Sequence, residues 1–146
     1  MPIEGEYEPS ANEFSREQVE LYERTAGAEG NLRHGLPVII LTSRGAKSGK
    51  VRKSPLMRVE HDGSYAAVAS MGGAPNNPEW YHNLVADTHV EVQDGPAPRD
   101  MRARLVEGEE KAIWWERAVA AFTNYAAYQQ KTDREIPLFV IEPLDR

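Results

Sequence analysis

Residues 36–58, LPVIILTSRGAKSGKVRKSPLMR, decide how this chain folds. The first seven residues are apolar and rich in β-branched side chains, which is typical of a buried strand. The part from 44 to 58 carries six lysines and arginines and no acidic residue, with Gly45 and Gly49 among them. Glycine lets backbone N–H groups approach an anion closely, and lysine adds positive charge. The stretch therefore predicts a buried strand that leads into an anion-binding loop, although a solvated basic turn fits these residues alone equally well.

The basic part superficially matches the phosphate-binding P-loop, G-x-x-x-x-G-K-[ST], but its spacing fails. Gly45 lies only four residues before Gly49, and Val51 follows Lys50 where a Ser or Thr should bind magnesium. The next element also has the pattern of a strand and not of a helix. We therefore exclude a Walker-type nucleotide hydrolase.

The composition indicates a single domain and excludes several kinds of site. The chain has 146 residues and no Cys, which excludes disulfides, thiolate catalysis and Cys-ligated metal centres and suits the cytoplasm. No apolar run approaches the roughly 20 residues of a membrane span, and the acidic N-terminus lacks the apolar core of a signal peptide. Peripheral association with a membrane stays open.

The negative charge of the chain belongs to its N-terminal segment. The formal net charge is −6, and residues 1–29 hold eight acidic and two basic residues, while the rest of the chain holds fifteen of each. The acidic total and the lack of a recognisable module argue against nucleic-acid binding. We expect residues 1–11 to form a flexible acidic leader before a single domain at 12–146.

The remaining pattern alternates strands with a few helices. We expect a helix at 12–26, where Ser15 and Gln18 resemble a capping box, a short inserted helix at 78–86 and a long helix at 109–130. The expected strands cover residues 36–42, 55–61, 65–70, 89–93, 99–106 and 137–141, with a hairpin turn at Asp62-Gly63. This order predicts an α+β protein whose antiparallel sheet curls into a barrel, with an N-terminal, a short inserted and a long C-terminal helix.

Three further segments carry groups that could contact a ligand. Residues 69–75, ASMGGAP, run from a strand into two glycines and include the Ser70 hydroxyl. Residues 80–83, WYHN, place two aromatic rings, a His and an amide on one helical turn. Tyr125 and Tyr128 lie near the end of the long helix, where a phenol could orient or protonate a substrate. Each segment also has a plainer interpretation, as a strand-ending loop or as core packing. The four histidines of the chain lack metal-ligand spacing, so we expect no metal site.

Taken together, three motifs resemble a known family. They are LTSRGAKSGKVRKSPLM at 41–57, VASMGGAPNNPEWYHNLVA at 68–86 and YQQKTDREIPLFVIEP at 128–143. The chain resembles the deazaflavin-dependent nitroreductase family of actinobacteria from about residue 37 to residue 143. This resemblance implies a split β-barrel related to that of flavin-binding oxidoreductases. It also implies the cofactor coenzyme F420, whose tail is a phosphodiester followed by lactate and glutamates.

The resemblance implies roles for residues of each motif. The phosphate and acidic tail would lie against Lys47, Ser48, Gly49 and Arg52. The deazaflavin would run beside Ser54, Pro55, Leu56 and Met57. Its ring or phosphate would contact Ala69, Ser70, Met71 and Gly72. The site would be closed by Trp80, Tyr81, His82 and Asn83. The acceptor pocket would be lined by Tyr125 and Tyr128, and these two tyrosines with Ser70 are the catalytic candidates.

The activity that the resemblance implies is hydride transfer from the reduced deazaflavin to a quinone-like or nitro-aromatic acceptor. Two alternatives remain: the same fold using FMN, whose single phosphate needs fewer than six cations, and a non-catalytic deazaflavin or ligand carrier. Met71, which stands where many family members have Lys, favours the carrier. Split barrels of this type often pair, so we expect a homodimer.

Overall fold

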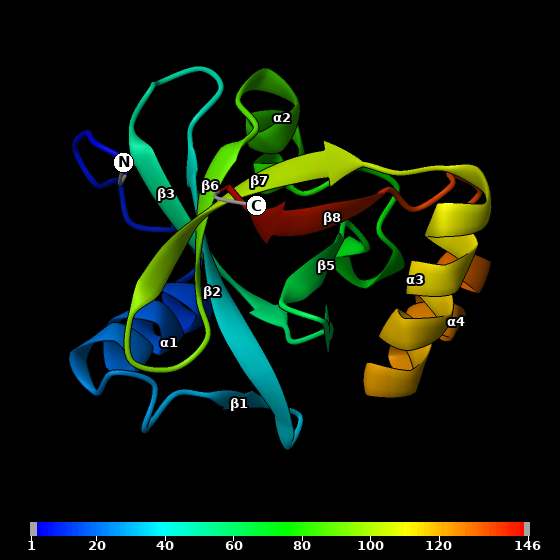
Figure 1. Cartoon of the computed structure of the whole chain (residues 1–146), viewed down its shortest axis with the longest axis horizontal. Helices are drawn as coiled ribbons and strands as arrows, with labels where there is room; N and C mark the ends of the chain where they lie inside the picture. The colour runs from blue at the N-terminus through cyan, green and yellow to red at the C-terminus, as the bar shows by residue number, and fades with distance from the viewer. Residues whose placement is uncertain (1–2, 145–146) are drawn as a thin grey trace.

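The computed structural model describes residues 3–144, and within them eight strands form one curled sheet (Figure 1). The sheet has the order β1-β2-β6-β7-β8-β5-β4, and β3 pairs with β2 outside this path. The strands are β1 (Leu32–Arg33), β2 (Leu36–Arg44), β3 (Val51–Met57), β4 (Glu60–His61), β5 (Ser64–Val68), β6 (His89–Gln93), β7 (Pro98–Leu105) and β8 (Leu138–Pro143). All these pairings are antiparallel, so the predicted α+β class and curled antiparallel sheet are confirmed.

Strand β2 is buried on both faces, as its apolar run predicts. Val38 and Ile40 pack into one apolar core, whereas Ile39 and Leu41 pack into another. Successive side chains of a strand point to opposite faces, so a run without polar interruptions needs cover on both sides. The sheet is therefore enclosed by two separate cores.

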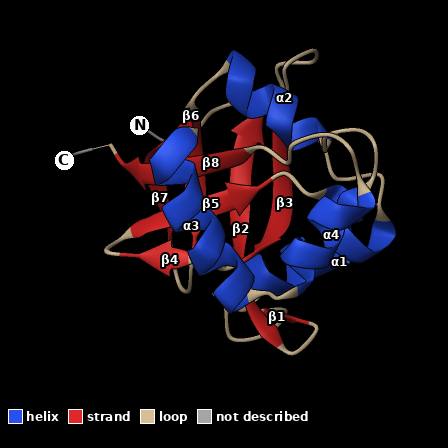
Figure 2. Ribbon diagram, turned by 90° about the vertical axis from the view of Figure 1, so that its right-hand side faces the viewer, coloured by secondary structure: helices blue, strands red, loops and turns tan. Residues whose placement is uncertain are grey.

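Helices complete both cores. Helices α1 (Glu13–Arg24), α3 (Gly108–Ala121) and α4 (Asn124–Lys131) contribute to the core around Val38, and α2 (Glu79–Ala86) contributes to the core around Ile39. Figure 2 shows α3 in front of the strands and α2 at their upper end. None of the helices within the described residues combines the length and hydropathy of a membrane span.

The predicted long helix at 109–130 is wrong, because the chain breaks into α3 and α4. Phe122 has extended backbone angles (φ −147°, ψ 97°), and its N–H donates to the carbonyl of Ala118 at 2.8 Å. The Phe122 ring joins an aromatic cluster with Tyr125 and Tyr128, with ring centroids 5.0 and 6.0 Å away. This packing overrides the helical period of the sequence.

The expected capping box at the start of α1 is also wrong. Asn12 is the N-cap, and its Oδ1 accepts the N–H of Ser15 at 2.9 Å. Gln18 instead donates to two backbone carbonyls after the helix. The expected hairpin turn at Asp62 and Gly63 is confirmed, since both residues have positive φ (52° and 82°) between β4 and β5.

The N-terminal leader lies along the start of β3. Tyr7 and Val51 form a parallel bridge, in which the Val51 N–H donates to the Glu6 carbonyl at 2.8 Å. The N–H of Glu8 donates back to the carbonyl of Val51 at 2.9 Å. Strand β3 therefore begins at Val51, earlier than the start at residue 55 that the sequence predicts. Val51 pairs with Tyr7 on one side and with Arg44 on the other. The mobility of the leader stays a prediction.

Candidate functional site

The loop that joins β2 to β3 is fixed by hydrogen bonds within itself and to α2. The N–H of Gly45 donates to Lys50 O at 2.7 Å, and the N–H of Gly49 donates to Gly45 O at 2.9 Å. Gly49 has φ +71°, a left-handed conformation that favours glycine. The Oδ1 of Asn83 accepts the N–H of Ala46 at 2.9 Å. The loop of the basic stretch is therefore held in a defined shape, while residues 46–49 at its tip are exposed to solvent.

Two basic side chains of this stretch form ion pairs with other elements. The Lys53 ammonium pairs with the Glu23 carboxylate on α1. The Arg58 Nε donates to the Asp94 carboxylate at 2.8 Å, and this pairing raises the pKa of the guanidinium. These two cations therefore stabilise contacts between elements.

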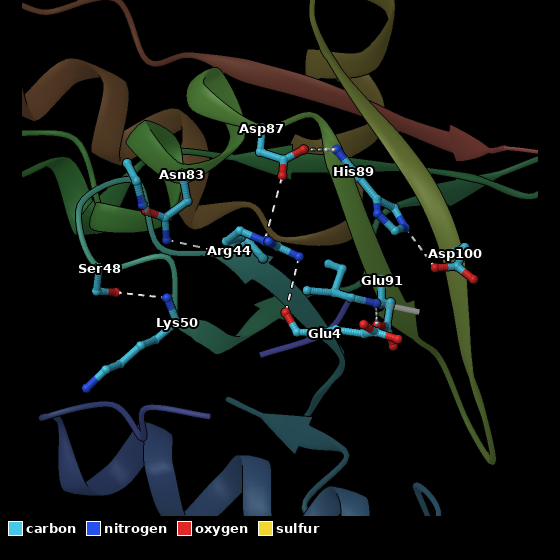
Figure 3. A network of polar contacts seen from close by, with 12 residues as sticks. Glu4, Arg44, Ser48, Lys50, Asn83, Asp87, His89, Glu91 and Asp100 are labelled. Atoms are coloured by element: carbon cyan, nitrogen blue, oxygen red, sulfur yellow. Dashed lines mark hydrogen bonds and ion pairs between the residues drawn. The ribbon is translucent and has the colours of Figure 1, made fainter. Parts of the chain in front are cut away.

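Arg44 links the loop to two other parts of the chain (Figure 3). Its Nη2 donates to the backbone carbonyl of Glu4 at 3.1 Å, and its Nε lies 3.9 Å from a carboxylate oxygen of Asp87. Figure 3 also shows Ser48 close to Lys50, whose N–H donates to the Ser48 hydroxyl at 3.1 Å. The loop is thus connected to the leader and to the end of α2.

A cavity of about 420 Å³, here called the loop cavity, lies beside this loop. Its lining includes the predicted residues Lys47, Ser48, Arg52, His82 and Asn83. Cationic, hydroxyl, imidazole and amide groups on one wall suit a phosphate or carboxylate ligand.

Two acidic side chains also line the loop cavity. The carboxylates of Glu8 and Glu79 lie 3.3 and 3.8 Å from the same guanidinium nitrogen of Arg52. These acids partly neutralise the cation, so an anionic ligand meets a balanced charge and not a purely basic surface.

A larger cavity of about 550 Å³, here called the aromatic cavity, lies between β3, β1 and helix α4. It brings together predicted residues from three distant motifs: Pro55, Leu56, Met57, Ser70, Met71, Gly72, Trp80, Tyr125 and Tyr128. Burial raises the pKa of Tyr125 above its ordinary value of 10.0, so its phenol keeps its proton at neutral pH. The cavity offers apolar and aromatic surface with hydroxyl groups, which suits a flat conjugated ligand.

A third cavity of about 470 Å³, here called the bridging cavity, adjoins both of the others. It shares Arg52 and Asn83 with the loop cavity, and it shares Met71, Pro78 and Trp80 with the aromatic cavity. The three cavities are therefore neighbours, and together they define a track from the basic loop to the aromatic rings. A track of this kind fits an elongated molecule with an anionic end and a flat end.

The segment after β5 forms a tight turn at the mouth of the aromatic cavity. Met71, Gly72 and Gly73 all have positive φ (45°, 65° and 82°), and the first two line the cavity. A Cβ on Gly73 would lie 2.8 Å from the carbonyl oxygen of Tyr128, so glycine lets this turn pack directly on α4. The Met71 side chain remains 56% exposed at the mouth.

Among the predicted site residues, Gly49, Ala69 and Tyr81 line none of the three cavities, and Ser54 lies at the middle of the track. Ser54 lines the bridging cavity, whereas Gly49 shapes the loop and Ala69 is fully buried in the core. Tyr81 follows Trp80 on α2 and so points about 100° away from it. Its ring packs on Phe139, with 5.7 Å between centroids, and lines a separate cavity. The position of Tyr81 gives no support to the expectation that it closes the site.

The sequence did not identify one wall of the aromatic cavity. This wall is formed by α1, β1 and the break between α3 and α4, through Phe14, Leu32, Arg33, His34 and Phe122. The Arg33 guanidinium lies 4.8 Å from the centroid of the Phe14 ring, and the His34 ring stacks on Phe122 at 5.7 Å. These residues come together only through tertiary packing, so their spacing in the sequence carries no signal.

Comparisons with known proteins identify relatives of this chain. The family model described as F420H(2)-dependent quinone reductase matches residues 14–143. An F420H(2)-dependent quinone reductase of Mycobacterium tuberculosis is 34% identical over 122 residues, covering 79% of this chain and 82% of that protein.

Two solved structures are closer in sequence. One is an F420-H2 dependent reductase that is 54% identical, with a TM-score of 0.69 over 73% of this chain and 94% of the other. The other is described as a domain-swapped dimer and is 50% identical, with a TM-score of 0.71 over 87% of this chain and 96% of the other. The expected split-barrel fold is confirmed by these likenesses. The chain therefore belongs to the F420H(2)-dependent quinone reductase family.

Proposed function

We propose that this protein binds reduced coenzyme F420 along the three connected cavities and transfers a hydride to a quinone-type acceptor in the aromatic cavity. F420 is the cofactor of the family to which the chain belongs. The observation that carries the proposal is the row of adjacent cavities, in which Arg52 and Trp80 each line two neighbouring cavities. An anionic tail and a flat ring system then find complementary surfaces in one direction along β3.

The residues at each end of the track fit the chemistry of this cofactor. At the loop end, Lys47, Ser48 and Arg52 would hold phosphate and carboxylate groups through charge and hydrogen bonds. At the other end, Leu56, Met57 and other apolar side chains of β3 would line the face of the ring system. Bound F420 supplies the hydride chemistry, so the protein contributes binding, orientation and exclusion of water.

We propose that Tyr125, Tyr128 and Ser70 act on the acceptor. All three line the aromatic cavity, and the rings of Tyr125 and Tyr128 lie 6.3 Å apart, centroid to centroid. Because burial keeps the Tyr125 phenol protonated, it is a hydrogen-bond donor for an acceptor oxygen. Donation there would favour the negative charge that develops on a quinone oxygen as it is reduced. A nitro-aromatic acceptor presents similar oxygen atoms and is included in the same proposal.

The experiment that tests this function follows oxidation of reduced F420 by a simple quinone and by a nitro-aromatic compound. Turnover with the quinone is the expected result, and Tyr125→Phe should lower it while F420 affinity stays near that of the unmodified protein. Binding of FMN without F420 would refute the proposal. Binding of F420 without turnover with any acceptor would instead identify a carrier.

We also propose a homodimer. The structure that is 50% identical is described as a domain-swapped dimer, which supports pairing in this fold. Size-exclusion chromatography with light scattering should give twice the mass of 16.4 kDa, and a single-chain mass would contradict the proposal.

A further inference from the structure

Arg134 lies in the connection between α4 and β8, in a motif to which the proposed function assigns no role. Its guanidinium donates four hydrogen bonds to the segment from Ala69 to Asn77. The acceptors are Ala69 O at 3.1 Å, Ser70 O at 2.8 Å, Ala74 O at 2.9 Å and Asn77 Oδ1 at 2.7 Å. One side chain therefore binds both ends of the turn that borders the aromatic cavity.

The connection that carries Arg134 is itself fixed to α4. Gln129 donates from Nε2 to the Arg134 carbonyl at 2.9 Å, and its Oε1 accepts the N–H of Ile136 at 2.9 Å. Helix α4 also carries Tyr125 and Tyr128. Arg134 thus joins the tyrosine wall of the cavity to the wall formed by the turn.

The turn needs such support because its backbone is unusual. Met71 is a non-glycine residue at φ +45°, and two glycines with positive φ follow it. A residue other than glycine keeps left-handed backbone angles only where the surrounding structure stabilises them. The bonds to the carbonyls of Ala69, Ser70 and Ala74 flank this strained part on both sides.

We propose that Arg134 is a positioning residue, which holds the 69–77 turn in the shape that the cofactor requires. This inference rests on the proposed function for its effect on binding, but its effect on the turn stands apart from any ligand. Arg134 lines none of the three cavities described above, so it acts through Ser70, Met71 and Gly72.

The test compares Arg134→Ala and Arg134→Lys with the unmodified protein. Hydrogen exchange of residues 69–77, measured without cofactor, should be faster in Arg134→Ala, and added guanidinium at non-denaturing concentration should slow it again. The Kd for F420 should rise at least about tenfold in the same variant, because a multiply bonded charged donor is lost. Arg134→Lys retains the charge but not the fork of donors, so it should be intermediate.

Arg104→Ala is the matched control. Arg104 also makes several charged hydrogen bonds, to Glu110 and Glu142, but on the β7–β8 side of the sheet. The Arg104→Ala variant should have a lower thermal stability, whereas hydrogen exchange of residues 69–77 and the Kd for F420 should stay unchanged. The inference is overturned if exchange at 69–77 in Arg134→Ala equals that in the unmodified protein. It is also overturned if the F420 affinity of Arg134→Ala falls no more than that of Arg104→Ala. Failure of every protein to bind F420 would refute the proposed function, and the exchange data would still decide whether Arg134 orders the turn.

A second and independent observation concerns the acidic leader. Its glutamates stand on alternate residues, and two of them reach the cations of the basic stretch: Glu6 lies 3.3 Å from the Lys50 ammonium, and Glu8 lies 3.3 Å from the Arg52 guanidinium. The backbone pairing with Val51 holds the leader in an extended form along β3. Figure 3 shows the start of this segment, Glu4, beside Arg44.

We infer that the leader competes with the anionic end of the cofactor for Lys50 and Arg52. Glu8 already lines the loop cavity with Lys47 and Arg52. The acidic tail of the cofactor would therefore be repelled by the Glu8 carboxylate and would find Arg52 already paired. The backbone pairing with Val51 holds the main chain of the leader, whereas the Glu6 and Glu8 side chains are held by partly exposed ion pairs. Such pairs are individually weak, so an incoming anion can displace the two carboxylates from their cations. This inference also rests on the proposed function, because the competing leader would regulate cofactor binding at the same site.

The test uses the full chain with Glu6→Gln and Glu8→Gln combined. Affinity for a triglutamate peptide and for F420 should each increase about threefold or more at low salt, since two competing charges are removed. Glu109→Gln combined with Glu116→Gln removes the same charge from exposed positions of α3 and should change neither affinity.

Equal affinity in the leader variant and the control, weaker binding in the leader variant, or no triglutamate binding by any of the proteins would overturn the competition. Triglutamate binding is measured without F420. Loss of F420 binding alone would therefore count against the proposed function and not against the competition.

Discussion

The substitution Arg52→Gln tests whether the basic end of the track binds an anion. Arg52 lines both the loop cavity and the bridging cavity. In the loop cavity, the two cations Lys47 and Arg52 balance the two acids Glu8 and Glu79, so their sum is zero. Arg52→Gln leaves one cation against two acids, a net charge of −1. The variant should therefore repel the ligand that the unmodified cavity accepts.

The size of the effect follows from distance and burial. Two unit charges about 4 Å apart interact by about 1 kcal/mol in bulk water and by about 4 kcal/mol at an effective dielectric constant near 20. The Arg52 side chain is 25% exposed, which places it between these limits. We expect a loss of about 2 kcal/mol, or a rise of roughly 30-fold in the Kd for F420. Salt should reduce the difference.

The assay is titration with F420 at low and at high salt, followed by tryptophan fluorescence. Arg58→Gln is the matched control, because it removes the same charge from the same stretch while breaking only the pair with Asp94. Arg58 lines none of the three cavities. Equal losses of affinity in the two variants, or an unchanged Kd in Arg52→Gln, would refute the reasoning.

Three further outcomes follow from the structure. Gly73→Ala should lower the unfolding free energy by at least about 1 kcal/mol more than Gly72→Ala, because its Cβ would meet the Tyr128 carbonyl at 2.8 Å, whereas a Cβ on Gly72 meets nothing within 4 Å; equal thermal midpoints would contradict this. The raised pKa of Tyr125 contributes stability that is present below pH 10 and is lost as pH rises above 10, where the unfolded chain loses its phenol proton first. Tyr125→Phe should therefore show a smaller alkaline fall in unfolding midpoint, and an identical fall would argue against a buried phenol. Asn83→Ala loses its hydrogen bond to the basic loop and should lower stability by about 1 kcal/mol in chemical denaturation, while an unchanged midpoint would show that the loop does not need it.

The sequence predicted those parts of the fold that depend on local pattern. The β2 run and the Asp62-Gly63 turn follow from strand periodicity and from turn chemistry, and both are present. The break at Phe122 was missed because the Phe122 ring packs not only on Tyr125 and Tyr128 but also on His34, a residue far away in the chain. The helical spacing of apolar residues in a sequence does not show where packing against a ring from a distant segment interrupts the helix.

The candidate site divides in the same way. The glycines and charges gathered in one stretch indicated an anion-binding loop, and the family resemblance then singled out Lys47 and Arg52 within it. Tyr81 was grouped with Trp80 by adjacency, although neighbours on a helix point in different directions. Arg33 was not found, because it enters the cavity from a two-residue strand that has no pattern of its own.

The central claim is that F420 occupies the connected cavities beside Trp80. Trp80 is 8% exposed and lines two of them, while Trp114 and Trp115 lie on α3 and line neither. Titration with F420 and, separately, with FMN should quench tryptophan fluorescence strongly with F420 only. The quenching should fall sharply in Trp80→Phe and persist in Trp115→Phe. Binding of FMN in place of F420, or quenching by F420 that does not depend on Trp80, would contradict the claim.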